Sequence, residues 1–473
     1  MFIDIRIPLL GVLAGLAAPS IMAAPQVWSD SKKAGAFSNF SGTWDETSEN
    51  WTVPPARSGD RATANGSLTN WQADSVAWFG GNGAIAATPD GSFTVTVSGA
   101  HSAAGIRQVR DGTGEFTLEG GTLSITGPNG IRVERGTLTV NSSVAAASTL
   151  ILYLMAADEG STLVLGGENM DIKSGSVCLN GSPGIVRLTN ASALGRGKGS
   201  LELRSNPKNS AADTLDLNGL TVTQGRTLDN PQVGEGTARL VNDHATEEAT
   251  FTDGIHLRST TLLAFGGTGA GLVLSGTIAG DGTLITTGTT TVTLTKTNIY
   301  TGGTTISEGS TLLAAGSSSA PTGKGEVTIE AGGTLASEEG KVAVIGPVTT
   351  VAGTSGLAPG ATSAAKVGAA GQLNLEGGLN LAEGGTIFFD LGATVATSDL
   401  IKIASGTTFT GAKAPGGITF KFTKAGALAR SYVLIDFTGA TTSGIQPAMF
   451  KAEGVSGNFQ LNGSKLEFYP TGS

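Results

Sequence analysis

Short runs of alternating apolar and polar residues, closed by glycine or asparagine, recur along most of the chain. Residues 92–97 read Ser-Phe-Thr-Val-Thr-Val, residues 136–140 read Gly-Thr-Leu-Thr-Val, and residues 291–295 read Thr-Val-Thr-Leu-Thr. Period-two alternation over four to six residues is typical of half-buried β-strands. The pattern predicts an all-β protein whose Val, Leu and Ile side chains point inward, while Thr and Ser point outward.

The middle of the chain is repetitive. A glycine followed by Thr-Leu or Ser-Thr-Leu occurs at Gly121, Gly136, Gly160, Gly282, Gly309 and Gly333. The last three recur at intervals of about 25 residues, a spacing typical of one coil of a β-solenoid. At about 20–25 residues per coil, residues 84–380 would form roughly 12–15 coils and a rod roughly 60–70 Å long. Such a rod has exposed strand edges at both ends, which need covers.

The two flanks of this zone have a different composition. All five tryptophans lie in residues 24–83, at Trp28, Trp44, Trp51, Trp71 and Trp78. We interpret them as the core of an N-terminal cap; the alternative is a platform on which carbohydrate rings stack. Larger apolar side chains return in residues 381–473. The expected division is a signal peptide (1–23), a Trp-rich cap (24–83), a β-solenoid (84–380) and a C-terminal β region (381–473) that forms the second cap.

Composition and charge limit the partners. Of 473 residues 72 are glycine and only 14% are charged, with a net charge of −9. The chain lacks the basic footprint of a nucleic-acid binder, and no cluster of four Lys or Arg suits an anionic membrane. The single Cys178 excludes an intrachain disulfide framework and a Cys-based zinc site, so we expect a small buried hydrophobe there.

The N-terminus has the layout of a secretory signal. Residues 7–18 form a 12-residue apolar run, and small residues follow up to Ala23. The run is too short for a transmembrane helix, and no later stretch reaches about 18 apolar residues. We therefore expect an exported protein that is not integral to a membrane once the signal is removed.

One stretch resembles a known repeat family. Residues 298–312 read Asn-Ile-Tyr-Thr-Gly-Gly-Thr-Thr-Ile-Ser-Glu-Gly-Ser-Thr-Leu, preceded by Leu-Ser-Gly-Thr-Ile-Ala-Gly-Asp-Gly-Thr-Leu at 274–284. This resembles the autotransporter-associated β-strand repeat, also called the passenger-associated transport repeat, over about residues 272–336. Residues 42–51 and 76–79 also look like the start of such proteins.

The resemblance implies a right-handed parallel β-helix from bacteria, in a passenger-like region without the β-barrel translocator. It implies an extracellular or outer-surface location, with the periplasm as a further option, and a separate outer-membrane export partner. The implied role is adhesive or structural, with glycans or host or cell-surface glycoproteins as partners and no nucleic acid. The family's motif residues are turn glycines and outward polar residues, so no catalytic residue, cofactor or metal site is expected.

The alternative is a β-helix polysaccharide hydrolase or lyase that uses acidic residues in 213–253. The acids and histidines of this part of the chain are Asp213, Asp216, Asp229, Glu235, Asp243, His244, Glu247, Glu248, Asp253 and His256. Two facing carboxylates about 5–9.5 Å apart would suit glycoside hydrolysis, and Asp243 with His244 could form a base and its orienting partner. The favoured interpretation is a solvated acidic insertion loop. The sequence Gly280-Asp-Gly282 resembles part of a calcium-binding repeat but occurs once.

Overall fold

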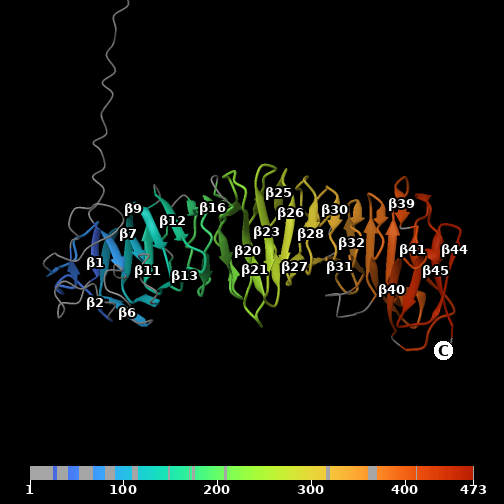
Figure 1. The fold of residues 1–473 in the computed structure, drawn as a ribbon, viewed down its shortest axis with the longest axis horizontal. Coiled ribbons are helices and arrows are strands. Elements are labelled where there is room, and N and C mark those ends of the chain that lie inside the picture. Colours follow the sequence, from blue (N-terminus) through green and yellow to red (C-terminus); the bar gives the residue numbers. More distant parts are fainter. Residues whose placement is uncertain are drawn as a thin grey trace, which may run out of the picture.

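The computed structural model shows an elongated rod with the N-terminal strands at one end and the C-terminal strands at the other (Figure 1). It describes residues 25–28, 41–52, 68–79, 91–108, 115–147, 150–169, 171–172, 176–206, 210–315, 320–360, 370–411, 413–424 and 426–471. The expected signal peptide lies outside these residues. The described part contains no α-helix, and its two helical turns are the 3₁₀ helices η1 (Val395–Thr397) and η2 (Pro447–Met449).

One sheet, which we call sheet 2, runs along the whole rod. In the described residues it contains, in order of pairing, β2 (Gly42–Trp44), β6 (Ser92–Val97), β8 (Glu115–Glu119), β10 (Thr137–Val140), β13 (Thr162–Leu165), β15 (Ile185–Leu188), β17 (Thr214–Asp216), β20 (Thr237–Val241), β23 (Leu262–Gly267), β26 (Leu284–Gly288), β28 (Thr304–Ile306), β30 (Val327–Ile329), β33 (Val348–Thr350), β36 (Leu379–Leu381), β39 (Thr408–Gly411) and β42 (Thr441–Ser443). Every pairing between its neighbours is parallel.

A second sheet, sheet 1, forms another side of the N-terminal half of the rod. Its described strands are β1 (Pro25–Trp28), β3 (Trp51–Thr52), β4 (Leu68–Thr69), β5 (Val76–Phe79), β7 (Ala100–Gln108), β9 (Thr122–Val133), β11 (Ser143–Ala146), β12 (Ile151–Ala156), β14 (Ser176–Leu179), β16 (Ser200–Leu203), β19 (Thr227–Asp229), β22 (Ile255–Leu257) and β25 (Ile278–Gly280). Early coils therefore alternate between two sheets.

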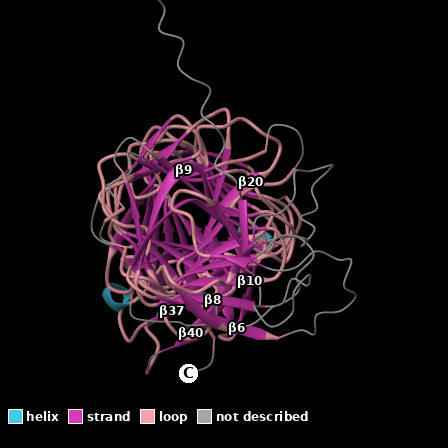
Figure 2. Cartoon of the chain, turned by 90° about the vertical axis from the view of Figure 1, so that its left-hand side faces the viewer, coloured by secondary structure: helices cyan, strands magenta, loops and turns pink. Residues whose placement is uncertain are grey.

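Two further sheets begin later. Sheet 3 contains β18 (Thr221–Val222), β21 (Ala249–Phe251), β24 (Leu272–Leu274), β27 (Thr291–Leu294), β29 (Thr311–Ala314), β31 (Thr334–Ser337), β34 (Gly356–Ala358), β37 (Thr386–Leu391), β40 (Ile418–Lys424) and β43 (Phe450–Glu453). Sheet 4 contains β32 (Val342–Ile345), β35 (Gln372–Leu375), β38 (Leu400–Ile403), β41 (Tyr432–Asp436), β44 (Gly457–Asn462) and β45 (Lys465–Pro470). Each late coil contributes strands to three sheets. In the end view the strands wrap around the rod axis (Figure 2).

The register gives the coil lengths directly. Leu284 pairs with Thr304 and Thr304 with Val327, so these coils take about 20–23 residues each, as solenoid repeats commonly do. Towards the C-terminus, Thr408 pairs with Thr441, which makes a longer coil of about 33 residues. The coil length expected from the sequence therefore describes the repeat region, whereas the last coils exceed it. Parallel pairing continues past residue 381 as far as β43.

The core is a stack of apolar rows, with one residue from each coil. In sheet 2 the paired residues Phe116, Leu138, Leu163, Val186, Leu215, Leu240 and Phe265 form such a row, and each is at most 2% exposed. The intervening residues, such as Thr137 and Thr139, are more accessible. The predicted inward and outward faces are therefore confirmed, and stacking buries what no coil could bury alone.

Antiparallel pairs close both ends of the rod. At the N-terminus β3 pairs antiparallel with β1 and β4, and all five tryptophans are at most 8% exposed. Trp44 and Trp51 contact edge to face with ring centroids 4.9 Å apart. At the C-terminus the β44–β45 hairpin pairs antiparallel with β41 and packs Phe468 on Phe422 at 4.3 Å. The predicted parallel β-helix with two caps is confirmed, and the buried tryptophans offer no stacking platform for sugars.

Candidate functional site

The acidic segment is part of the rod. Residues 214–257 form the six strands β17 to β22, all paired in parallel with neighbouring coils. Asp213, Asp216 and Asp229 are at most 8% exposed. The interpretation as a solvated insertion loop is therefore wrong, because Asp213, Asp243 and Asp253 accept hydrogen bonds from the backbone of adjacent coils.

Asp213 shows how these carboxylates are used. Its oxygens accept hydrogen bonds from the backbone N–H groups of Gly181, Ser182 and Arg204 at 3.0, 2.9 and 2.7 Å. Burial raises the pKa of this carboxyl to about 6, and the three N–H groups oppose that shift. Asp213 therefore holds three turn amides that would otherwise be buried without a partner.

Asp216 and Asp229 are held by arginines. Arg187 Nε donates to Asp216 Oδ2 at 2.7 Å, and the guanidinium of Arg258 binds both oxygens of Asp229 at 2.8 and 2.6 Å. His256 Nδ1 lies 3.6 Å from Asp229 Oδ1. Two parallel N–H···O bonds to one carboxylate fix its orientation, so Asp229 is held as a structural link between coils.

The remaining members of the set lie nearer the surface, and Asp243, His244 and Asp253 each bind a different turn. Asp243 Oδ1 accepts from Thr268 N and Oγ1, at 2.9 and 3.0 Å. His244 Nδ1 accepts from Glu247 N at 3.0 Å, so it closes its own turn and does not orient Asp243. Asp253 accepts from the backbone of Gln224 and Gly225. The exposed members are Glu235, Glu247 and Glu248.

Two other sequence features have structural explanations. Asp281, in the Gly-Asp-Gly sequence, accepts from Ser259 N and Oγ at 3.0 and 2.8 Å. Across the part of the chain that the structure describes, no group of three His, Cys, Asp or Glu side chains is placed to hold a metal ion. Cys178 is fully buried, as expected, and burial raises the pKa of its thiol.

Along the rod, sheet 1 ends at β25 and sheet 4 begins at β32. Asn298 and Tyr300 of the repeat motif lie on the same side of the rod, in the stretch between these two sheets. Asn298 Oδ1 accepts from Ile278 N at 2.8 Å, while Nδ2 donates to Pro321 O at 2.6 Å. The Tyr300 hydroxyl lies 2.6 Å from Thr304 Oγ1. Both residues are at most 2% exposed. The Asn298 side chain therefore bridges three successive coils, beside backbone hydrogen bonds such as that from Ile299 N to Ile278 O at 2.9 Å.

A glycine of the same motif is required by its backbone. Gly303 has φ +89°, and a Cβ there would lie 2.6 Å from Glu326 O of the next coil. A residue with a side chain would meet both a strained φ and a backbone clash. The repeat's glycines thus set how closely its coils stack.

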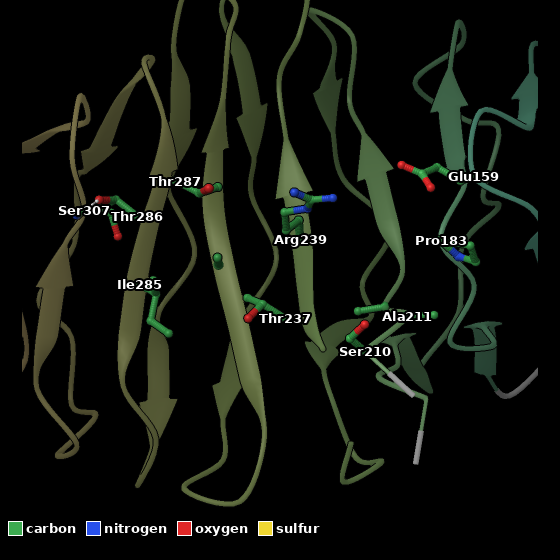
Figure 3. A pocket seen from close by; sticks show the side chains of 12 residues that line it. Glu159, Pro183, Ser210, Ala211, Thr237, Arg239, Ile285, Thr286, Thr287 and Ser307 are labelled. Atoms are coloured by element: carbon green, nitrogen blue, oxygen red, sulfur yellow. Dashed lines mark hydrogen bonds between the residues drawn. The ribbon is translucent and has the colours of Figure 1, made fainter. Parts of the chain in front are cut away.

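A groove of about 700 Å³ crosses the outer face of sheet 2. Glu159 and Pro183 lie toward one end, Arg239 projects from β20 near the middle, and Thr287 and Ser307 lie toward the other end (Figure 3). The lining residues come from strands β20, β23 and β26 and from turns next to β13, β15, β17 and β28. The groove therefore runs across successive coils, along the rod.

Small side chains beside a large one create this groove. In the register of sheet 2, Arg239 pairs with Thr214 on one side and with Ala264 on the other. Thr214 and Ala264 are 5% and 1% exposed, so their short side chains lie low between taller neighbours. The next residue of this row is Ile285, half-buried and also lining the groove.

Arg239 is the exposed cation of this groove. Its Nε donates to Thr214 Oγ1 at 3.3 Å, and none of the ion pairs among the described residues includes it. An exposed guanidinium without a carboxylate partner keeps donors for a ligand oxygen. Sequence reasoning missed Arg239; its outward position in Thr-Ala-Arg-Leu-Val (237–241), within an otherwise Thr- and Ala-rich face, was the available signal.

Comparisons with known proteins leave the family open. No protein-family model matches the chain, and no curated protein matches it. Among solved structures, the Haemophilus influenzae Hap adhesin is similar with a TM-score of 0.19 and 12% identity, over 95% of this chain and 71% of that one. The parallel β-helix described above rests on the strand pairing itself. None of the helices in the described residues has the length and hydropathy needed to cross a bilayer.

Proposed function

We propose that this chain is an exported bacterial β-helix that acts as a non-catalytic adhesive or structural module, with glycans or cell-surface glycoproteins as its ligands. The observation that carries the proposal is the groove on sheet 2. It crosses several coils, is lined mainly by hydroxyls, small side chains and one unpaired arginine, and suits an extended polar chain. Many weak contacts along a rod supply avidity without a deep pocket.

The hydrogen bonds and ion pairs of the acidic residues favour a binding role over hydrolysis. A glycoside hydrolase needs two carboxyl groups that face the same sugar bond. Here Asp213, Asp216 and Asp229 are occupied by backbone amides and arginines of neighbouring coils. The polysaccharide hydrolase or lyase that uses acidic residues in 213–253 remains the second candidate, with Asp243 and Glu248 as the acids to test.

The finer assignments belong to the same proposal. Residues 272–336 are one autotransporter-associated β-strand repeat, supported by the bridge that Asn298 forms and by the close approach at Gly303. Residues 1–23 are a signal peptide, 24–83 a Trp-rich cap, 84–380 the solenoid, and 381–473 a C-terminal β region whose last strands form the second cap. The protein is displayed outside the cell or in the periplasm, and a separate outer-membrane protein exports it.

The test uses the purified chain on an immobilised panel of polysaccharides and glycoproteins, with retained protein and released sugar ends read in the same wells. We expect retention without release, and Arg239→Gln should lower retention roughly three- to tenfold, as for loss of one ordinary hydrogen bond. Arg196→Gln is the matched control, since Arg196 is exposed on the same part of the rod but does not line the groove.

Sugar release that disappears in Asp243→Asn or Glu248→Gln would overturn the proposal in favour of the enzyme. If neither retention nor release is observed, the remaining interpretation is a structural spacer without a binding site. Equal loss of retention in the Arg196→Gln and Arg239→Gln variants would move binding away from the groove.

A further inference from the structure

The charge of the rod is unevenly distributed. Residues 1–340 contain 20 Lys and Arg and 31 Asp and Glu, whereas residues 341–473 contain 9 and 7. The first stretch therefore carries −11 and the second +2, which together give the net −9. An asymmetry of this kind marks the C-terminal end as the part of the rod that attracts anions.

A second groove, of about 460 Å³, lies on the outer face of sheet 4 in this region. Three of its lining residues are lysines: Lys341, Lys402 and Lys465. They stand at or beside β32, β38 and β45, which are the first, third and fifth strands in the pairing order of the sheet. Neighbouring strands lie about 4.8 Å apart, so the lysines are spread over the whole width of the groove.

These lysines lack carboxylate partners. No ion pair among the described residues includes any of them. Asp436 is placed in register between Lys402 and Lys465, but its Oδ1 accepts from Thr438 N and Oγ1, at 3.1 and 2.6 Å. Asp436 is thus tied to its own turn, and the groove keeps more positive than negative charge.

The second acid of the groove adds little negative charge at neutral pH. Asp399 is 1% exposed and accepts from Gly371 N and Asp390 N, both at 2.8 Å. Its burial raises its pKa to about 8. Near pH 7 this carboxyl is largely protonated and does not repel an anion in the groove.

The rest of the lining is apolar or uncharged. Val342 and Val395 are 39% and 47% exposed, two of the larger exposed apolar side chains of the described chain. Aliphatic ledges beside a few charged groups suit a ligand with an apolar ring face and acid substituents. No aromatic side chain lines the groove for base stacking, and three lysines in a concavity are fewer than a lipid-binding cluster has.

We propose that the sheet 4 groove binds an acidic polysaccharide, whose carboxylate or sulfate groups are held by Lys341, Lys402 and Lys465 while its sugar rings lie against Val342 and Val395. This site is separate from the groove on sheet 2. Its ligand class is narrower than that of the proposed function, and neither site depends on the other.

The test measures binding of polygalacturonate to the purified full chain, with fully methyl-esterified polygalacturonate as the uncharged form of the same polymer. We expect binding to the acidic polymer alone, weakened by added salt. Lys402→Gln with Lys465→Gln should weaken it roughly tenfold, since each exposed ion pair contributes a few-fold. Lys451→Gln is the control, because Lys451 lies on sheet 3 and already pairs with Glu453 at 3.3 Å.

Several results would overturn this assignment. They are equal binding of the esterified polymer, unchanged binding by the double variant, or an equal loss in Lys451→Gln. A sulfated glycan in a parallel arm tells whether sulfate replaces carboxylate. Equally tight binding of anionic vesicles or single-stranded DNA would show unspecific polyanion binding and reject a sugar site. Loss of Arg239 should leave polygalacturonate binding intact, which separates this site from the groove on sheet 2.

Discussion

Residues 213–256 and residues 272–336 are neighbouring stretches of one rod, yet they close their coils by different means. In the first stretch Thr214 pairs with Arg239 and Thr237 with Leu262, so a coil takes about 25 residues. In the second, the repeat core, the register of Leu284, Thr304 and Val327 gives shorter coils. In the first stretch, Asp213 and Asp253 accept from turn amides, and arginines hold Asp216 and Asp229. In the repeat core, the Asn298 side chain and closely approaching glycines link the coils, and Asp281 binds one turn amide. Extra backbone in a turn needs extra partners, and charged side chains supply them.

The largest expected effect is in the first stretch. Asp213→Ala leaves three buried N–H groups without an acceptor, and we expect a loss of about 3–5 kcal/mol in the free energy of unfolding. Urea unfolding followed by circular dichroism measures it, and hydrogen exchange should show the opening in β14 to β17. Glu247→Ala, at an exposed position of the same stretch, is the control, with less than about 0.5 kcal/mol expected. A loss below about 1 kcal/mol for Asp213→Ala would contradict the comparison.

The repeat core should respond to one side chain almost as strongly. Asn298→Ala removes both bonds of the bridge between Ile278 and Pro321, and we expect a loss of about 2–3 kcal/mol. Hydrogen exchange at β25 to β30 is the local measurement. The neighbouring Ile299 is 54% exposed, so Ile299→Ala should change little. Equal effects of the two variants would show that the repeat core is held by its backbone alone.

Mild acid should distinguish regions that bury acids from the repeat core. Asp399 and Asp213 have pKa values raised to about 8 and about 6, above the ordinary aspartate value of 3.8. The folded state therefore binds more protons than the unfolded state between about pH 4 and these values, and stability falls as pH rises through that window. Lowering the pH from about 8.5 to about 6.5 should add about 2 kcal/mol through Asp399.

Thermal melts across this pH range measure the effect, and Asp399→Asn should flatten the upper part of the profile. In the repeat core, Asp281 behaves differently because its bonds to Ser259 lower its pKa. Its contribution is kept at neutral pH and is lost only in stronger acid. A melting temperature that rises steadily as the pH is increased from about 6.5 to about 8.5 would reject the assignment of Asp399 as a buried, largely protonated carboxyl.

Sequence patterns predicted the architecture well and the polar interior poorly. Alternation identified strands such as β10 and β27, and the concentration of tryptophans identified the N-terminal cap. The same reasoning placed Asp213 and Asp216 in a solvated acidic loop, because carboxylates are normally exposed. Three of their partners, Gly181, Ser182 and Arg187, lie a full coil or more away in the chain, and no local pattern shows such a contact.

The two grooves illustrate the same limit. Arg239, Lys402 and Lys465 each read as ordinary outward residues of a strand. They are candidates for binding because of their neighbours in the sheet register. Arg239 lies beside short side chains, and Asp436, between the two lysines, is hydrogen-bonded to Thr438.

By itself, the sequence determined the all-β class, the stacking repeat, the inward and outward faces and the presence of caps. Those properties follow from local periodicity and from glycine's backbone freedom, which are properties of neighbouring residues. The coil lengths outside the repeat, the burial of the acids and both grooves were decided by the tertiary structure. The reason is that each depends on which residue of one coil lies over which residue of the next, and that register is set by turn lengths and packing over a whole coil.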